Sequence, residues 1–284
     1  MSTEPSDPRS VFAAGLFAGR TAVVTGGGRG IGAAAALGFA HLGANVVIAS
    51  NAPDELEKTG ADIEALGGEC LQVDVNIRDV ESVEAFRDAT LERFGAVDYL
   101  INNAGGQFMT HPLNISDNGW RAVIDLNLNG TWNVTNRFMR PMMERRTGSI
   151  VNVVHVFSFE RGAPMFAHSG AARAGVVNLT RSLAPYLEER NVTINALAPG
   201  TTISPDAAAN YGMTAEEWRA QPSRTRYADP EDMAAIMLFL CSPAARMING
   251  AVLVADAAST QHNWPSMDKL FDQVQAEFSG QPAT

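Results

Sequence analysis

Short apolar runs alternate with longer amphipathic segments along almost the whole chain. The runs are rich in Val, Ile and Ala and predict seven strands, at 21–25, 45–49, 70–73, 97–101, 149–154, 192–197 and 251–255. Helical spacing of apolar residues predicts six helices between them, at 30–42, 54–66, 78–94, 119–145, 168–189 and 230–241. Strands that alternate with helices form a parallel sheet covered on both faces. The pattern therefore predicts an α/β fold with a seven-stranded, doubly wound parallel sheet.

One segment interrupts this alternation. Residues 200–228 contain Pro205, Gly212 and Pro222 and predict at most a short helix, at 214–220. Because ligands of such sheets bind beyond the carboxyl ends of the strands, a long insertion after a strand is a candidate lid over the substrate. A surface loop without a role is the alternative.

Length and composition indicate one domain. With 284 residues, of which 46% are hydrophobic, the chain can form one large core, and nothing in it resembles an interdomain linker. We expect a disordered segment at 1–14, the folded domain at 15–258 and a C-terminal tail at 259–284. The first residues lack the apolar core of a signal peptide, and no run of 18 apolar residues occurs. No membrane association is expected.

Charge and cysteine content exclude further classes. The formal net charge is −10 and no lysine- or arginine-rich block is present, so nucleic acid is not an expected partner. Cys70 and Cys241 are too few and too far apart for a disulfide framework or a cysteine-based metal site. We expect a cytoplasmic protein without a metal.

A glycine-rich stretch joins the first predicted strand to the first predicted helix. It reads Thr-Gly-Gly-Gly-Arg-Gly-Ile-Gly over residues 25–32. Glycines allow a tight turn and a close approach to a pyrophosphate, whose charge the N–H groups of the helix start can bind. An ordinary glycine-rich turn is the alternative, but the flanking strand and helix favour a dinucleotide site. The predicted ligands here are Gly26, Gly28, Arg29, Gly30, Ile31 and Gly32.

The end of the second strand bears on the choice of cofactor. A carboxylate there would accept hydrogen bonds from a ribose 2′-hydroxyl and repel a 2′-phosphate. The chain has Ser50 and Asn51 instead, with no carboxylate before Asp54, and Arg29 is the only basic residue that we place near this ribose. NADPH is the expected cofactor. NADH stays possible, because Arg29 could equally be a solvated surface side chain.

Three further motifs accompany the glycines: Asn102–Gly105 after the fourth strand, Asn127 in Leu-Asn-Leu-Asn-Gly, and Pro199-Gly200 after the sixth strand. Together with the opening motif they resemble the short-chain dehydrogenase/reductase family over residues 15–258. The resemblance implies a single-domain Rossmann fold in which Asn127 organises a water chain. The cofactor contacts that it adds are Asp74 and Val75 near the adenine, Asn103, Ala104 and Gly105 along the cleft, and Pro199, Gly200, Thr202 and Ser204 beside the nicotinamide. Each of these positions could instead serve a local turn.

The catalytic segment departs from the family pattern of a serine followed by Tyr-x-x-x-Lys. Alignment of the fifth strand and the next helix places His155 at the serine, Ser169 at the tyrosine and Arg173 at the lysine, with a separation of 14 positions between the first two. No shifted alignment restores the pattern, since the only lysines are Lys58 and Lys269 and no tyrosine falls in this segment.

The replacements change the available proton chemistry. Arg173 can still bind the nicotinamide ribose, but a guanidinium keeps its proton. Ser169 is a far weaker acid than a phenol. His155 could donate to a substrate oxygen or relay protons, or it could be a structural donor only. Tyr211, in the candidate lid, is the tyrosine that the topology allows to reach the crevice.

Residues 167–175, Ala-His-Ser-Gly-Ala-Ala-Arg-Ala-Gly, are similar to the trans-2-enoyl-CoA and 2,4-dienoyl-CoA reductase branch of the family. The resemblance implies hydride transfer to an α,β-unsaturated acyl thioester, with the CoA ester as the expected substrate, in a homotetramer or homodimer. Fixed donors can stabilise the enolate oxygen while water supplies the Cα proton, so a strong protein acid is dispensable. Two alternatives stay open: a nucleotide-binding protein without turnover, and an alcohol or carbonyl dehydrogenase that uses His155.

Overall fold

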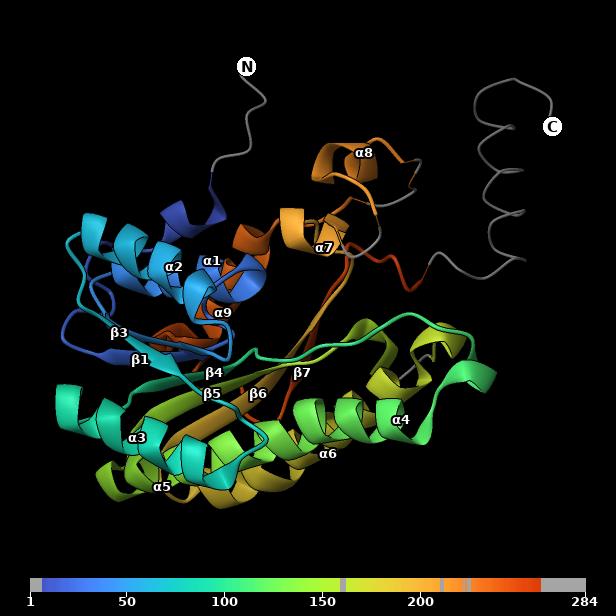
Figure 1. Ribbon diagram of the computed structural model, residues 1–284. Helices are drawn as coiled ribbons and strands as arrows, with labels where there is room; N and C mark the ends of the chain where they lie inside the picture. The colour runs from blue at the N-terminus through green and yellow to red at the C-terminus, as the bar shows by residue number, and fades with distance from the viewer. Residues whose placement is uncertain (1–6, 159–161, 210–211, 222, 224–225, 262–284) are drawn as a thin grey trace.

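The chain forms one parallel sheet between two layers of helices (Figure 1). A computed structural model describes residues 7–158, 162–209, 212–221, 223 and 226–261. The strands are β1 Thr21–Thr25, β2 Asn45–Ser50, β3 Cys70–Asp74, β4 Tyr99–Asn102, β5 Gly148–Val153, β6 Val192–Pro199 and β7 Val252–Ala255. They lie in the order β3-β2-β1-β4-β5-β6-β7, and all six pairings are parallel. The seven-stranded sheet predicted from the sequence is confirmed.

The helices divide between the two faces. On one face lie α1 Gly30–His41, α2 Pro53–Ala65 and α9 Pro230–Cys241; on the other lie α3 Val80–Phe94, α4 Asp117–Ile124, α5 Gly130–Arg145 and α6 Ala167–Glu188 (Figure 1). Two short helices, α7 Pro205–Ala209 and α8 Ala215–Arg219, belong to the insertion after β6. The 3₁₀ turns are Pro8–Val11, Pro112–Asn114, Val156–Ser158, Pro164–Phe166 and Pro243–Ala245.

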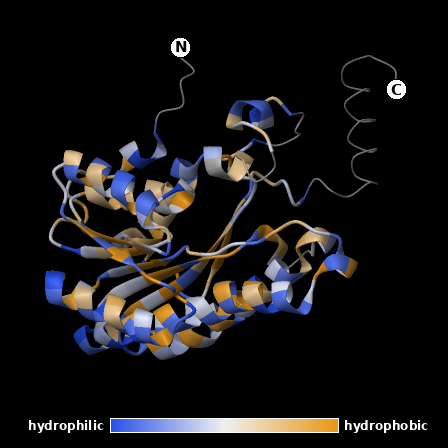
Figure 2. Ribbon diagram, in the orientation of Figure 1, coloured by the Kyte–Doolittle hydropathy of each residue, from blue (hydrophilic) through white to orange (hydrophobic). Residues whose placement is uncertain are grey.

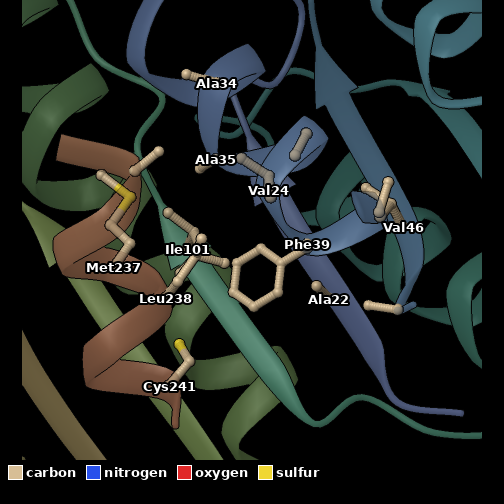
Figure 3. Packing of buried hydrophobic residues seen from close by; sticks show 14 of the residues in the cluster. Ala22, Val24, Ala34, Ala35, Phe39, Val46, Ile101, Met237, Leu238 and Cys241 are labelled. Carbon is tan, nitrogen blue, oxygen red and sulfur yellow. The ribbon is translucent and has the colours of Figure 1, made fainter. Parts of the chain in front are cut away.

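Hydrophobic residues run along the strands and over the helix faces that pack on them (Figure 2). All five residues of β1 are buried, as expected for a central strand covered on both faces. On one face the ring of Phe39 from α1 lies beside Ile101 of β4 and Leu238 of α9 (Figure 3). On the other, Phe86 of α3 and Phe138 of α5 pack with ring centroids 4.9 Å apart.

The predicted helix at 119–145 contains an irregularity. Its central residues, Asp125–Asn129, form a π-helical segment between α4 and α5. Such segments add a residue to one turn and occur often at functional sites. This one carries Asn127, which is buried. The apolar spacing of the segment did not reveal the extra residue.

Two parts of the chain outside the regular alternation are also ordered. Residues Pro8–Val11 form a 3₁₀ turn inside the segment expected to be disordered, because Asp7 caps the turn and Arg9 donates to the carbonyl of Ala34 at 3.3 Å. After β7, Ala257 and Ala258 adopt φ angles of 50° and 63°, a region that favours glycine. The turn after β7 therefore forms with two alanines at positions that favour glycine.

Among the described residues, no helix is both long and apolar enough to cross a membrane. Cys70 and Cys241 are free thiols.

Candidate active site and cofactor cleft

The glycine turn has the geometry that a pyrophosphate requires. Gly26 and Gly30 have φ angles of 62° and 53°, where a side chain would be strained. A Cβ on Gly32 would lie 2.0 Å from the carbonyl oxygen of Gly26, so the helix start can approach the strand end only with glycine there. Helix α1 has no side-chain cap at its N-terminus. Its first N–H groups are therefore available to an anion.

A cleft of about 430 Å³ opens in front of this turn, beside the carboxyl ends of the neighbouring strands β1 and β4. At this position the strand order reverses, which is where ligands of doubly wound sheets bind. The sequence-predicted residues that line the cleft are Gly26, Arg29, Gly30, Ile31, Ser50, Asn51, Val75, Asn103, Ala104, Gly105, Thr202 and Ser204.

The other predicted cofactor residues lie outside the lining. Gly28 packs against Glu55 and Gly32 against Gly26. Asp74 is exposed at the end of β3, where it pairs with Ser50. Pro199 ends β6, and a Cβ on Gly200 would lie 2.6 Å from the Cα of Asp256.

Asn103 holds two strand ends together. Its side-chain amide donates to the carbonyls of Thr25 and Gly26, both at 3.1 Å. The hydroxyl of Thr25 accepts from the backbone N–H groups of Asn103 and Ala104, again at 3.1 Å. Asn103 thus fixes the floor of the cleft between β1 and β4.

The far end of the cleft, beside β2, carries more charge than the sequence suggested. Arg29 forms an ion pair with Glu55, with 3.3 Å between Nη1 and Oε1. Arg78 lines the same cleft, and its Nε donates to Asn76 at 3.2 Å. The expectation that Arg29 is the only basic residue near this end was therefore wrong. The topology explains the error, since the parallel pairing of β2 and β3 brings the loops after both strands to one edge.

Asn127 is bonded into the wall of the cleft by its π-helical segment. Its amide donates to the carbonyls of Gly106 and Val123 at 2.8 Å each, and its Oδ1 accepts from the N–H of Gly106 at 3.2 Å. These bonds fix the loop after β4 against the α4–α5 junction.

Arg173 is half-buried behind Gly105, with its Nε fully enclosed. Its Nη1 donates to the carbonyl of Val153 at 2.8 Å, and its Nε has no hydrogen-bond partner. A Cβ on Gly105 would lie 2.7 Å from Arg173 Nη2 and equally close to Asn127 Oδ1. Only glycine at this position lets the guanidinium lie directly against the backbone that lines the cleft. Burial lowers the pKa of Arg173 to about 10, which leaves it a cation at neutral pH.

Ser169 lies on the first turn of α6, four residues before Arg173. Its hydroxyl donates to Oε1 of Gln107 at 2.6 Å. Gln107 belongs to the loop after β4, so this hydrogen bond joins that loop to the first turn of α6. The sequence contained Gln107 in the Gly-Gly-Gln-Phe stretch but gave no indication of its partner.

His155 follows β5 and is held as a neutral ring. Burial, followed by the charge of Arg173, lowers the pKa of His155 to about 4. Its Nδ1 accepts from the N–H of Phe157 at 3.2 Å, which leaves the proton on Nε2. His155 is therefore a fixed donor at neutral pH and a poor source of a transferable proton.

Two other buried polar groups near these positions have no hydrogen-bond partner. They are the hydroxyl of Ser158 and both ring nitrogens of His168. The His168 ring packs edge-on to Phe108, with centroids 4.4 Å apart. Burial lowers the pKa of His168 below its usual value.

The insertion after β6 is closed at its base. Thr202 pairs with Ala228 in an isolated β-bridge, and Arg219 of α8 forms an ion pair with Asp229. Ser204 accepts from the N–H of Ala207 at 3.1 Å and begins α7 near Gly30. Tyr211, the predicted lid tyrosine, lies outside the described residues.

Within the described part of the chain, no group of three or more His, Cys, Asp or Glu side chains is arranged to hold a metal ion. Sequence reasoning missed Glu55, Arg78 and Gln107, which tertiary contacts bring to the site. The parallel pairing of β2 and β3 could have indicated Arg78, since its loop follows β3.

Known proteins share this architecture. A family model described as enoyl-(acyl carrier protein) reductase matches residues 26–260. A probable 2,4-dienoyl-CoA reductase of Caenorhabditis elegans is 33% identical over 88% of this chain and 83% of its own length. A 3-oxoacyl-[acyl-carrier-protein] reductase of Synechocystis is 37% identical over 84% of this chain and 95% of its own.

Among solved structures, a citronellol catabolism dehydrogenase of Pseudomonas aeruginosa superposes with a TM-score of 0.77 and 33% identity, covering 88% of this chain and 99% of that one. The cleft at the strand reversal and the family match over most of the chain lead to one assignment. The chain belongs to the short-chain dehydrogenase/reductase family of oxidoreductases, which use NAD(H) or NADP(H).

Proposed function

We propose that the protein is an NADPH-dependent reductase of α,β-unsaturated acyl thioesters, with an enoyl-CoA as substrate. The observation that carries the proposal is the donor set at the catalytic positions. His155, Ser169 and Arg173 offer hydrogen bonds or charge, yet none of them releases a proton readily at neutral pH.

This donor set suits an enolate. The reduced nicotinamide supplies a hydride to Cβ of the thioester, and negative charge then develops on the thioester oxygen. Nε2–H of His155 and the side chains of Ser169 and Gln107 are the groups proposed to orient and stabilise that oxygen. Arg173 is proposed to bind the nicotinamide ribose, and its buried charge also favours the developing anion. Water would supply the proton at Cα.

Reduction of a ketone makes a different demand. Its oxygen needs a proton as hydride arrives, and His155, with a pKa of about 4, is neutral and a weak acid near pH 7. The similarity to a 3-oxoacyl-[acyl-carrier-protein] reductase makes ketone reduction the appropriate comparison.

The cofactor choice rests on the two arginines of the adenosine end. Arg29 and Arg78 can both approach a ribose 2′-phosphate, and Ser50 and Asn51 place no carboxylate at the end of β2. Asp74 and Val75 remain the proposed adenine contacts. We also propose a cytoplasmic homo-oligomer, a tetramer or a dimer.

The direct test follows NADPH absorbance after addition of crotonyl- to decenoyl-CoA, beside acetoacetyl-CoA as the matched ketone. Oxidation that depends on the enoyl substrate supports the proposal. Tight cofactor binding without turnover on either substrate would show a non-redox nucleotide-binding protein. Efficient ketone reduction that His155→Ala abolishes would make histidine the acid and contradict the enoyl assignment.

A second test restores the family pair. Ser169→Tyr together with Arg173→Lys should create or strengthen reduction of acetoacetyl-CoA, because a lysine-flanked phenol supplies the missing proton. The single variants His155→Ala and Ser169→Ala should each cost part of the turnover on enoyl-CoA, and Arg173→Ala should harm cofactor binding most.

A further inference from the structure

The adenosine end of the cleft contains a carboxylate that no sequence motif indicates. We propose that Glu55 is a cofactor-specificity residue: by neutralising Arg29 it weakens the preference for NADPH over NADH. The inference rests on the proposed binding of a dinucleotide in this cleft, and it concerns the position of one negative charge there.

The backbone of Glu55 is fixed beside the glycine turn by close packing. It lies in the first turn of α2, and a Cβ on Gly28 would lie only 2.8 Å from the Cβ of Glu55. Four residues later, the hydroxyl of Thr59 donates to the carbonyl of Gly28 at 2.9 Å. Two consecutive turns of α2 therefore pack on the glycine turn, which keeps the Cβ of Glu55 beside it and the carboxylate within reach of Arg29.

The Glu55 carboxylate is paired with the arginine of the glycine motif. The 3.3 Å ion pair joins two side chains that both line the cleft. The side chain of Arg29 is 57% exposed and that of Glu55 is 33% exposed. Exposed pairs of this kind contribute little to stability. Their placement at a binding site still matters, because a charged ligand group must compete with Glu55 for Arg29.

The two cofactors differ at this end by one phosphate. A 2′-phosphate carries nearly two negative charges, so Arg29 and Arg78 attract it and Glu55 repels it. A 2′-hydroxyl is neutral and is little affected by these charges. Glu55 should therefore act on NADPH and leave NADH nearly unchanged.

The experiment compares Glu55→Gln with Asp54→Asn. Asp54 is the exposed neighbour in the same helical turn and does not line the cleft. Dissociation constants for NADPH and NADH are measured by titration calorimetry on the full chain without thioester, and thermal melting confirms folding. Glu55→Gln should tighten NADPH binding about five- to tenfold and change NADH binding less than about twofold. Asp54→Asn should change the ratio of the two constants less than about twofold.

Two results would overturn the proposal. One is an unchanged NADPH-to-NADH ratio in Glu55→Gln. The other is a loss of NADH affinity alone, which would make Glu55 a partner of the 2′-hydroxyl. Thioester turnover does not enter the measurement, so failure of the enoyl-CoA assignment remains separate. A wild type that binds NADH better, with NADPH still tightened in Glu55→Gln, would refute the NADPH preference and support the role of Glu55.

Discussion

Arg173 is a half-buried cation with a buried Nε, and no ion pair to it is found among the described carboxylates. Removing a guanidinium from water is costly, and one hydrogen bond to the carbonyl of Val153 offsets only part of that cost. A charge held at such a cost is typical of a functional site, which agrees with the proposed role of Arg173.

Arg173→Met should separate these two effects. We expect the variant to be as stable as the wild type or more stable, by about 1–3 kcal/mol, because an apolar chain replaces a desolvated charge. Cofactor affinity should fall by about tenfold or more, since the proposed contact with the nicotinamide ribose is lost. Chemical denaturation and cofactor titration measure the two quantities. Arg181→Met, an exposed position on the same helix, is the control and should change neither. A large loss of stability in Arg173→Met would contradict this interpretation.

Substitution of Arg29 should affect the binding of the two cofactors differently. Arg29→Ala should weaken NADPH binding by about 1–2 kcal/mol and NADH binding by much less, because only NADPH brings a phosphate to this end. Competition binding against each cofactor measures the difference. Equal losses for both would place Arg29 at the shared pyrophosphate instead.

His155 predicts a pH dependence of stability. Its pKa is about 4 in the folded protein, below the usual value near 6.5, so the unfolded chain binds its proton first as the pH falls. The contribution of neutral His155 to the free energy of unfolding is therefore present above pH 6.5 and is lost as the pH falls toward 4. Between pH 7.5 and pH 5, protonation linked to His155 should lower the free energy of unfolding by about 2 kcal/mol.

Urea unfolding of the wild type and of His155→Asn at both pH values tests the expectation. On acidification, the free energy of unfolding should fall less in His155→Asn than in the wild type, by about 2 kcal/mol. The dependence should not vanish, because the pKa of buried His168 is also lowered. Parallel pH profiles for the two proteins would show that His155 titrates normally.

At the scale of elements, the sequence predicted the bounds of the central strand β1 correctly. The five residues of β1 were predicted with both ends correct, since a strand covered on two faces is a continuous apolar run bounded by glycine. The π-helical segment Asp125–Asn129 was not predicted, because its cause is the tertiary contact of Asn127 with the loop at Gly106. Glu55 and Gln107 were not predicted for the same reason, since their partners, Arg29 and Ser169, are distant in sequence. Arg78 was not predicted because the pairing of β2 with β3 brings its loop to the cleft.

The turn after β7 shows how two alanines are tolerated where glycine is usual. Asp256 accepts from the N–H groups of Ala258 and Thr260, both at 2.9 Å, and from the hydroxyl of Thr260 at 2.7 Å. Burial alone would raise the pKa of Asp256, but these hydrogen bonds lower it below the usual value. The bonded carboxylate thus holds Ala257 and Ala258 in a strained conformation.

Replacing one of these alanines should relieve the strain. Ala258→Gly should stabilise the protein by about 1 kcal/mol, since glycine adopts a φ of 63° without the Cβ penalty. Thermal or urea denaturation measures the change. Ala220→Gly, at an exposed residue with a φ of −74°, should be neutral or destabilising. If both variants lose stability equally, the turn is not strained.

At the scale of the whole molecule, the helical layer of α4, α5 and α6 leaves large aromatic side chains exposed. The helices predicted at 119–145 and 168–189 lie on one side of the sheet, as α4, α5 and α6 (Figure 1). There Trp120, Trp132 and Tyr186 remain 42%, 39% and 53% exposed. Large exposed aromatic side chains are typical of protein interfaces. These residues therefore support the proposed self-association.

Assembly through α5 should make the stability of the protein depend on its concentration. Because subunits would bind one another only when folded, the melting temperature should rise with protein concentration. Trp132→Glu should remove this dependence and shift the sedimentation coefficient toward a smaller species, because a carboxylate would be buried against the partner. Leu66→Glu is the matched control: Leu66 is 51% exposed but ends α2 on the opposite layer, and its substitution should leave the oligomer intact. A wild type that sediments as a monomer at every concentration, or a Trp132→Glu variant that assembles normally, would place the interface elsewhere or show that there is none.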